Sequence, residues 1–157
     1  MTKTRDEGQT LVEVAISMFL LVLFTMAAID CGYLFCTKLT LQNAVRQAGR
    51  YAITGQCITG GNGSCTETRY NSVITTLQTS SDGFLNASNA GDITISCTNE
   101  GGGCPNNTGG PGDQVTISVA YPYGFISPLM GAFFTSHAYT IKVSATFTNE
   151  PFPPATS

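Results

Sequence analysis

Six cysteines are the most reactive side chains in this 157-residue sequence. Four of them flank Gly-rich loops in two pairs: Cys57 and Cys65 enclose CITGGNGSC, and Cys97 and Cys104 enclose CTNEGGGC. In an oxidising compartment we expect a disulfide within each pair, because short flexible loops close most easily. Four cysteines permit three pairings, so spacing alone leaves the connectivity open.

A zinc site is the alternative for these four cysteines. Zinc knuckles usually separate paired ligands by about two to four residues, whereas seven and six residues intervene here. We therefore expect disulfides and no metal. Cys31 and Cys36 stand five apart in a predicted helix, poorly aligned for a bridge, so we expect free, packed thiols.

Catalytic constellations are missing from the sequence. His137 is the single histidine and begins a predicted strand, where an edge or surface role is typical. The Gly-rich runs at 60–61 and 101–103 lack the Lys-Ser/Thr ending of a phosphate-binding loop. We expect no catalytic residue and no cofactor, and the chain is predicted not to be an enzyme.

Charge is scarce, at 11% of residues, where an average soluble chain has about 25%. From residue 55 onward, two basic residues stand against six acidic ones. Nucleic-acid binding requires clustered Lys and Arg to displace phosphate counterions. The sequence therefore argues against a nucleic-acid partner.

An apolar run from Leu11 to Ile29 contains nineteen residues, with Glu13 as its only charge. About 20 such residues span a bilayer, and the short, Gly- and Thr-rich remainder offers little protein to bury a core helix on all sides. No small-residue cleavage site of the A-x-A type follows the run, which argues against a cleaved secretory signal. Residues 11–29 are therefore predicted to form a single transmembrane helix, in contact with membrane lipid. Lys3 and Arg5 place the N-terminus in the cytoplasm.

A carboxylate such as Glu13 inside this run makes membrane insertion less favourable, so such a residue is usually paired with another group or functional. Snorkelling to the headgroups is the simpler explanation. A short charged leader, however, ends at Gly8, and Glu13 is the fifth residue after it. This arrangement resembles the processing and assembly signal of type IV pilin-like precursors. The resemblance implies cleavage after Gly8 by a prepilin peptidase, so that the mature chain begins at Gln9.

The same resemblance assigns Glu13 to assembly. Cleavage would create a cationic α-amine at the helix tip, which a buried carboxylate of a neighbouring subunit could neutralise.

Beyond the span the pattern becomes amphipathic, and no Pro occurs before Gly55. One face is apolar and another is polar or basic. The apolar face carries Leu34, Leu41, Ala44, Ala48 and Tyr51, and the polar face carries Lys38, Gln42, Arg46 and Arg50. One continuous helix is predicted from Leu11 to Ile53, roughly 65 Å long at 1.5 Å per residue.

Three stretches carry a closer resemblance, to the TadE-like family of pseudopilins of the tight-adherence (Tad, Flp) pilus. They are Gly8 to Glu13, Ile29-Asp30 with Gly32, and Leu41-Gln42-Asn43-Ala44-Val45-Arg46 through Gly49-Arg50-Tyr51-Ala52. Residues 121–150 are more weakly similar to the C-terminal half of such proteins. Two departures are the lack of a mid-span Pro and the presence of Cys31 and Cys36. The resemblance implies other pilins or pseudopilins, a prepilin peptidase, membrane platform proteins and an assembly ATPase as partners.

The region after Gly55 is predicted to be a small head. Two stretches alternate as half-buried strands, one with Val115, Ile117, Val119 and Tyr121 and one with Tyr139, Ile141, Val143, Ala145 and Phe147. Ile93, Ile95 and Cys97 predict a third strand. A short helix is expected over residues 66–79, with a buried stripe of Tyr70, Val73, Ile74 and Leu77. The apolar segment 125–134 is either a lid on this core or a contact patch.

The predicted fold is α+β and pilin-like: a long N-terminal helix, half transmembrane and half amphipathic, packed against a small antiparallel sheet. We divide the chain into a cleaved leader (1–8), the long helix (9–54) and a disulfide-containing extracytoplasmic head (55–157). The predicted function is that of a TadE-like pseudopilin, held in the inner membrane and then part of a pilus used in adhesion, surface attachment or secretion. The alternative is an uncleaved, single-pass anchored periplasmic binding module.

Overall fold

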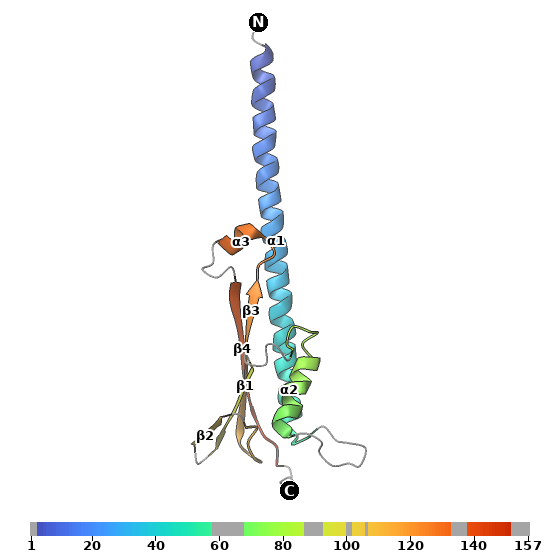
Figure 1. The fold of residues 1–157 in the computed structure, drawn as a ribbon, viewed down its shortest axis with the longest axis vertical. Coiled ribbons are helices and arrows are strands. Elements are labelled where there is room, and N and C mark those ends of the chain that lie inside the picture. Colours follow the sequence, from blue (N-terminus) through green and yellow to red (C-terminus); the bar gives the residue numbers. More distant parts are fainter. Residues whose placement is uncertain are drawn as a thin grey trace. The chain divides into compact units, whose positions relative to one another are not determined.

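The computed structural model of the chain describes residues 3–57, 68–86, 93–99, 102–105, 107–132 and 138–151. It is an α+β protein, as the sequence predicts (Figure 1). Its elements are α1 (Lys3–Ile53), α2 (Arg69–Thr79), β1 (Ile93–Asn99), β2 (Gly102–Pro105), β3 (Gln114–Gly124), α3 (Pro128–Ala132) and β4 (Ala138–Thr148).

Helix α1 contains 51 residues and ends at Ile53, as predicted, but it begins at Lys3 rather than Leu11. The segment before Leu11 holds no Pro, and one helical Gly costs only about 1 kcal/mol relative to Ala, so little opposes helix there. At the other end, Gly55 adopts a φ of 68° and donates its N–H to the carbonyl oxygen of Ala52 at 3.2 Å. This left-handed residue stops the helix.

The span prediction agrees with the properties of α1. Its part from Gly8 to Ile53 is long and apolar enough to cross a membrane, and none of its most apolar window is buried by the protein. An apolar helix surface that the chain itself leaves uncovered calls for a nonpolar environment. The helix is therefore a candidate membrane anchor.

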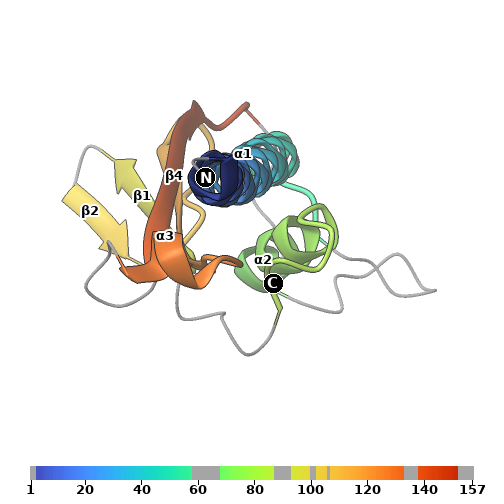
Figure 2. The same ribbon diagram turned by 90° about the horizontal axis from the view of Figure 1, so that it is seen from above.

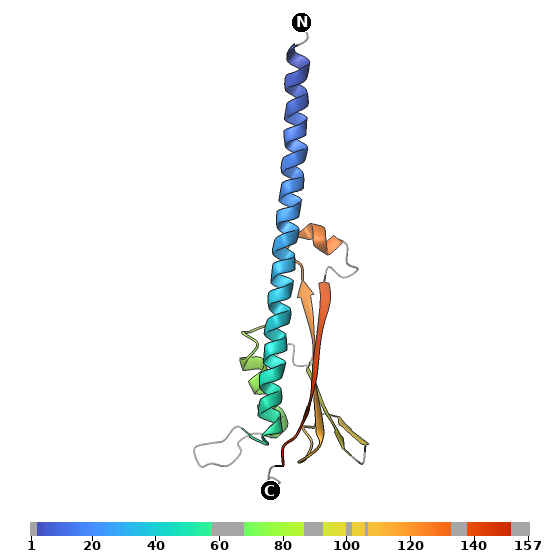
Figure 3. The ribbon, with the colours of Figure 1, turned by 180° about the vertical axis from the view of Figure 1, so that it is seen from behind.

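The described residues form two compact units. Unit 1 contains residues 3–35, 124–132 and 138–139, and unit 2 contains the rest. In unit 2 the sheet and α2 lie against the C-terminal part of α1 (Figures 2 and 3). Its core consists mainly of Leu41, Ala44, Val45, Ala48, Ala52, Val73, Leu77, Ile95, Ile117, Ile141 and Val143, all buried.

The four strands form a sheet in the order β2-β1-β3-β4. β1 is antiparallel to both neighbours, with Ile95 opposite Ile117 and Cys97 opposite Cys104. β2 was not predicted from the sequence, since GGCP has no alternation; its pairing with β1 imposes the extended backbone. The buried face of β3 holds Val115, Ile117 and Val119, which confirms the predicted alternation.

Two predicted packing stripes need correction. Tyr139 of β4 is 46% exposed rather than core-facing, although Ile141 and Val143 are buried. In α2, Val73 and Leu77 are buried, but Tyr70 and Ile74 are only half-buried. A helix on a domain surface buries a narrow stripe, so the flanking positions stay partly open.

Candidate functional site

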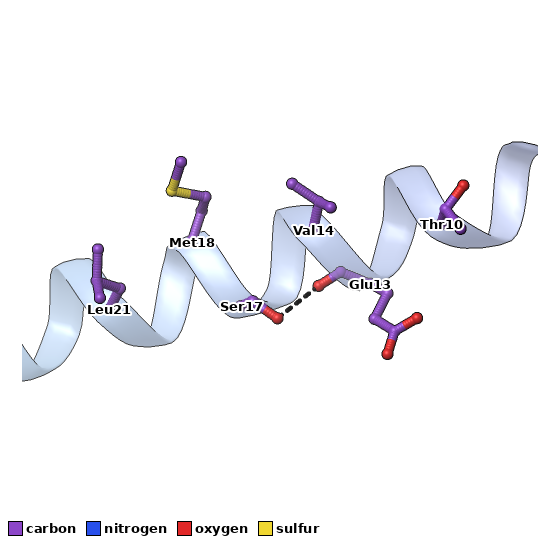
Figure 4. Close-up of a pocket in the computed structure, with 6 residues that line it drawn as sticks. All are labelled: Thr10, Glu13, Val14, Ser17, Met18 and Leu21. Atoms are coloured by element: carbon purple, nitrogen blue, oxygen red, sulfur yellow. Dashed lines mark hydrogen bonds between the residues drawn. The ribbon is translucent and has the colours of Figure 1, made fainter.

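Glu13 lies on an uncovered part of α1 together with Thr10, Val14, Ser17, Met18 and Leu21 (Figure 4). These residues all belong to one helix, so they form an open surface rather than an enclosed cavity. The Ser17 hydroxyl donates to the Glu13 backbone carbonyl at 2.8 Å, whereas the Glu13 carboxylate extends away from the ribbon. Within the described residues, that carboxylate has no hydrogen bond or ion pair.

Gly8 and Gln9, the predicted cleavage site, are both exposed in the first part of α1. A Cβ atom added to Gly8 would meet nothing within 4 Å, and the backbone is not in the left-handed region. Neither packing nor backbone conformation therefore requires glycine at this position. Whether the bond after Gly8 is cleaved stays a prediction.

The structure brings together a polar site in unit 1 that the sequence did not predict. The Asp30 side chain is only 1% exposed and accepts hydrogen bonds from the segment before α3. The N–H of Ile126 donates to Asp30 Oδ1 at 3.0 Å, and the N–H and hydroxyl of Ser127 donate to Asp30 Oδ2. We call this set of bonds between Asp30 and residues 126–127 the Asp30 clasp.

Ser127 also organises α3. Its hydroxyl oxygen accepts the N–H of Met130 at 3.3 Å, and Pro128 occupies the first helical position. Ser followed by Pro is a common start of a helix, so this signal in the sequence could have located α3. The partner Asp30, 97 residues away, could not have been found in this manner.

The apolar segment 125–134 was predicted to be a core lid or a contact patch. Phe125 and Met130 are half-buried and lie with Leu34 beside Asp30, whereas Ile126 is 60% exposed. The segment therefore covers part of α1 in unit 1 while leaving one large apolar side chain open. Phe133, Phe134 and His137 lie outside the described residues.

Gly49 provides a second contact of α1, this time in unit 2. A Cβ atom at residue 49 would lie 2.1 Å from Cε2 of the Phe147 ring on β4. Such a separation is far below van der Waals contact, so the absence of a side chain at Gly49 is what admits the ring. The sheet can therefore approach α1 closely at this point.

Gly8, Glu13, Asp30 and Gly49 thus lie on one helix whose sequence can be compared with known families. Residues 8–50 match the family model of TadE-like proteins. Comparison with curated proteins and with solved structures found no match. The match covers about a quarter of the chain and confirms the resemblance over this part of α1.

The C-terminal end of α1, at Ala52 and Ile53, is held by groups that are distant in the sequence. Arg69 donates from Nη2 to the carbonyl oxygen of Ala52 at 3.1 Å and from Nη1 to that of Gly109 at 2.8 Å. The N–H of Glu150 donates to the carbonyl oxygen of Ile53 at 3.0 Å. Helix-terminal carbonyls lack partners within the helix, and these bonds supply them. Burial lowers the pKa of the Arg69 guanidinium from its ordinary value.

Asn149 joins the loop before β3 to the end of β4, which it follows directly. Its Nδ2 donates to the carbonyl oxygens of Thr108 at 2.9 Å and Gly110 at 2.8 Å. Its backbone N–H donates to the carbonyl oxygen of Asp113 at 2.8 Å. Asn149 is only 3% exposed. It fastens the loop that leads into β3.

The cysteines give a mixed outcome. Cys31 and Cys36 are free, as predicted, but both are exposed rather than packed, because they lie on a face of α1 that the protein does not cover. Cys57 and Cys97 are each disulfide-bonded. Cys65 and the side chain of Cys104 lie outside the described residues, so both pairings stay predictions. The backbone register places Cys104 directly opposite Cys97, an arrangement compatible with a cross-strand bridge.

Proposed function

We propose that this chain is a pseudopilin, a structural subunit that is processed at Gly8 and assembled through Glu13 into a Tad-type pilus. The pilus would serve adhesion, surface attachment or secretion. The observation that carries this proposal is the Glu13 carboxylate, which is exposed in an apolar span without a hydrogen bond or ion pair among the described residues. A charge in such a place disfavours insertion unless it is matched. Since no described residue pairs with it, we infer that its partner comes from another molecule.

The matching cation would be the new α-amine of a processed neighbour. Cleavage after Gly8 puts that amine on Gln9, one turn before Glu13. In a bundle of apolar helices the two charges of adjacent subunits would lie in a low-dielectric environment, where a paired carboxylate and ammonium are tolerated and single ones are not.

Gly8 supports the same proposal because the fold gives it no role. Glycine within a helix costs about 1 kcal/mol relative to alanine, yet a Cβ at this position would meet nothing. A requirement for a peptidase to reach the backbone would explain the residue. Gly49 in the same helix differs from Gly8, because a Cβ atom at residue 49 would collide with the Phe147 ring and packing therefore requires glycine there.

The proposed role is structural rather than enzymatic, and it needs no metal, cofactor or nucleic acid. The buried polar side chains of Asp30, Arg69 and Asn149 bind backbone groups and hold the fold together. The proposed partners are other pilins or pseudopilins, a prepilin peptidase, and the platform and ATPase of the pilus machinery. The N-terminus would face the cytoplasm, with the anchor in the inner membrane and the head beyond it.

The test is the N-terminal residue of the native protein, measured by mass spectrometry in the host. We expect Gln9. Gly8→Leu should abolish processing, and Gly32→Leu is the matched control, because a Cβ at Gly32 also meets nothing within 4 Å. Purified native material that retains residues 1–8 would overturn the proposal.

One observation favours the alternative, an uncleaved anchored binding module. α1 runs through Gly8 and Gln9 without a break, and a helical backbone is a poor protease substrate unless it unwinds. The same measurement distinguishes the two functions, since an uncleaved module would retain its leader in every variant.

A further inference from the structure

Unit 1 exposes large apolar side chains outside the predicted span. On α1, Tyr33 is 57% and Phe35 is 62% exposed. On the segments that accompany it, Ile126 is 60% and Tyr139 is 46% exposed. Tyr33 and Phe35 are two positions apart and face different sides of α1. Ile126 and Tyr139 lie beside α1 at the level of Asp30, since the N–H of Ile126 binds Asp30 and Tyr139 lines the same pocket as Asp30 and Leu34. The four residues are therefore gathered near one level of unit 1, around the helix, and we call them the patch.

The patch carries little exposed charge. Asp30 is the only charged residue of α1 between Glu13 and Lys38, and its side chain is buried in the Asp30 clasp. Three donors from residues 126 and 127 surround the carboxylate, which keeps it away from the surface. The apolar surface of the span therefore continues past Ile29 without an exposed charge.

The position of the clasp along α1 matches the edge of a bilayer. A hydrocarbon core of about 30 Å corresponds to about 20 residues of helix. Counted from Leu11 this length ends at Asp30, and counted from Val14 it ends at Tyr33. Because the N–H of Ile126 binds Asp30 directly at 3.0 Å, the segment before α3 lies at the same level. Figures 1 and 3 show α3 beside α1.

We propose that this patch of unit 1, comprising Tyr33, Phe35, Ile126 and Tyr139, contacts the lipid–water interface of the membrane. The partner is the boundary between headgroups and acyl chains of a phospholipid bilayer. Tyr and Trp side chains are enriched at that depth, where an apolar ring and a polar group are both accommodated. Tyr33 and Tyr139 are of this type. The Asp30 clasp is the positioning element, since it holds the segment from Phe125 to Ala132 against the anchor at that level.

The contact goes beyond pilus assembly, because it concerns each subunit in the membrane whether or not it is processed. Its failure in the test below would leave the proposed cleavage at Gly8 untouched, since that is measured separately in the host.

The full chain contains no tryptophan, so single tryptophans report depth without background. We would reconstitute Ile126→Trp and Tyr139→Trp separately in phosphatidylcholine vesicles and quench them with lipids brominated near the carbonyl end of the acyl chains. Phe19→Trp, at a 64% exposed position in mid-span, is the lipid-embedded reference. Thr94→Trp, at an exposed position on β1, is the water-exposed control.

For an interfacial residue we expect quenching of Ile126→Trp and Tyr139→Trp to be at least about half that of Phe19→Trp, with blue-shifted emission. Thr94→Trp should be quenched less than about a tenth as much. Quenching of both test variants at the Thr94→Trp level would overturn the proposal. A blue shift without quenching would also overturn it, because it would mean that protein, such as a second copy, covers the patch. Tyr139→Trp exchanges one aromatic ring for another and decides the matter if Ile126→Trp does not fold.

Discussion

Gly49 of α1 and Phe147 of β4 are in direct contact, with the aromatic ring occupying the space where a side chain at residue 49 would begin. The two residues are 98 positions apart in the sequence. Through this contact β4 lies close to the C-terminal part of α1.

Gly49→Ala should therefore destabilise the head. The ring must move, and overpacking of this kind costs about 1–3 kcal/mol; because Phe147 is only half-buried, we expect the lower part of that range. Thermal or urea unfolding measures the loss. Gly32→Ala, in the same helix with open space around it, should be neutral or slightly stabilising. In the double variant with Phe147→Ala the penalty of Gly49→Ala should largely disappear, and full additivity would contradict the contact.

Asp30→Ala should loosen the segment before α3. The N–H groups of Ile126 and Ser127 would lose their acceptor, and an unsatisfied buried donor costs about 1–3 kcal/mol. Hydrogen exchange at these two amides should accelerate by at least about tenfold.

Asp30→Asn, which keeps one acceptor oxygen, should show an intermediate effect on the same amides. Glu13→Ala should leave their exchange unchanged, because its carboxylate binds no described residue. Protection that is equal in wild type and Asp30→Ala would show that the Asp30 clasp does not hold the segment.

Glu13→Gln should impair assembly with other pilins while membrane insertion remains normal or improves. A carboxylate within a span disfavours insertion by up to ~3 kcal/mol at full depth and by less near the interface. In the assembled bundle, its loss would leave the α-amine of a neighbour unpaired. The measurement compares membrane abundance, processing at Gly8 and co-assembly in the host. Unimpaired assembly would reduce Glu13 to a residue that snorkels at the membrane surface.

The full chain, expressed so that residues 55–157 reach an oxidising compartment, should contain disulfides between Cys57 and Cys65 and between Cys97 and Cys104. Each closes a short loop, so removing either should cost on the order of 2 kcal/mol. Non-reducing peptide mapping decides the connectivity. A peptide that links Cys57 to Cys104 would show that the two loops are joined to one another and that the local pairing is wrong.

The sequence by itself determined the features that depend on neighbouring residues. A run of apolar residues specifies the span, a change to helical periodicity specifies the continuation of α1, and alternation specifies β1, β3 and β4. The anomalous Glu13 is visible in the same way, because a single charge in an apolar run needs no knowledge of the rest of the chain. Each of these signals lies within one helix or strand and can be recognised without the rest of the chain. The end of α1 at Ile53 could be predicted for the same reason.

Only the tertiary structure decided which distant residues meet. Asp30 reads as the first polar residue after a span, and nothing near it in the chain indicates that the donors of Ser127 surround it. Gly49 reads as one of many glycines until Phe147 is placed over it. The extended conformation of the edge strand β2 is stabilised by its antiparallel pairing with β1. The periodicity of a helix or strand indicates which of its faces is buried, but not which residues pack against that face. Those residues are determined only when the whole chain packs.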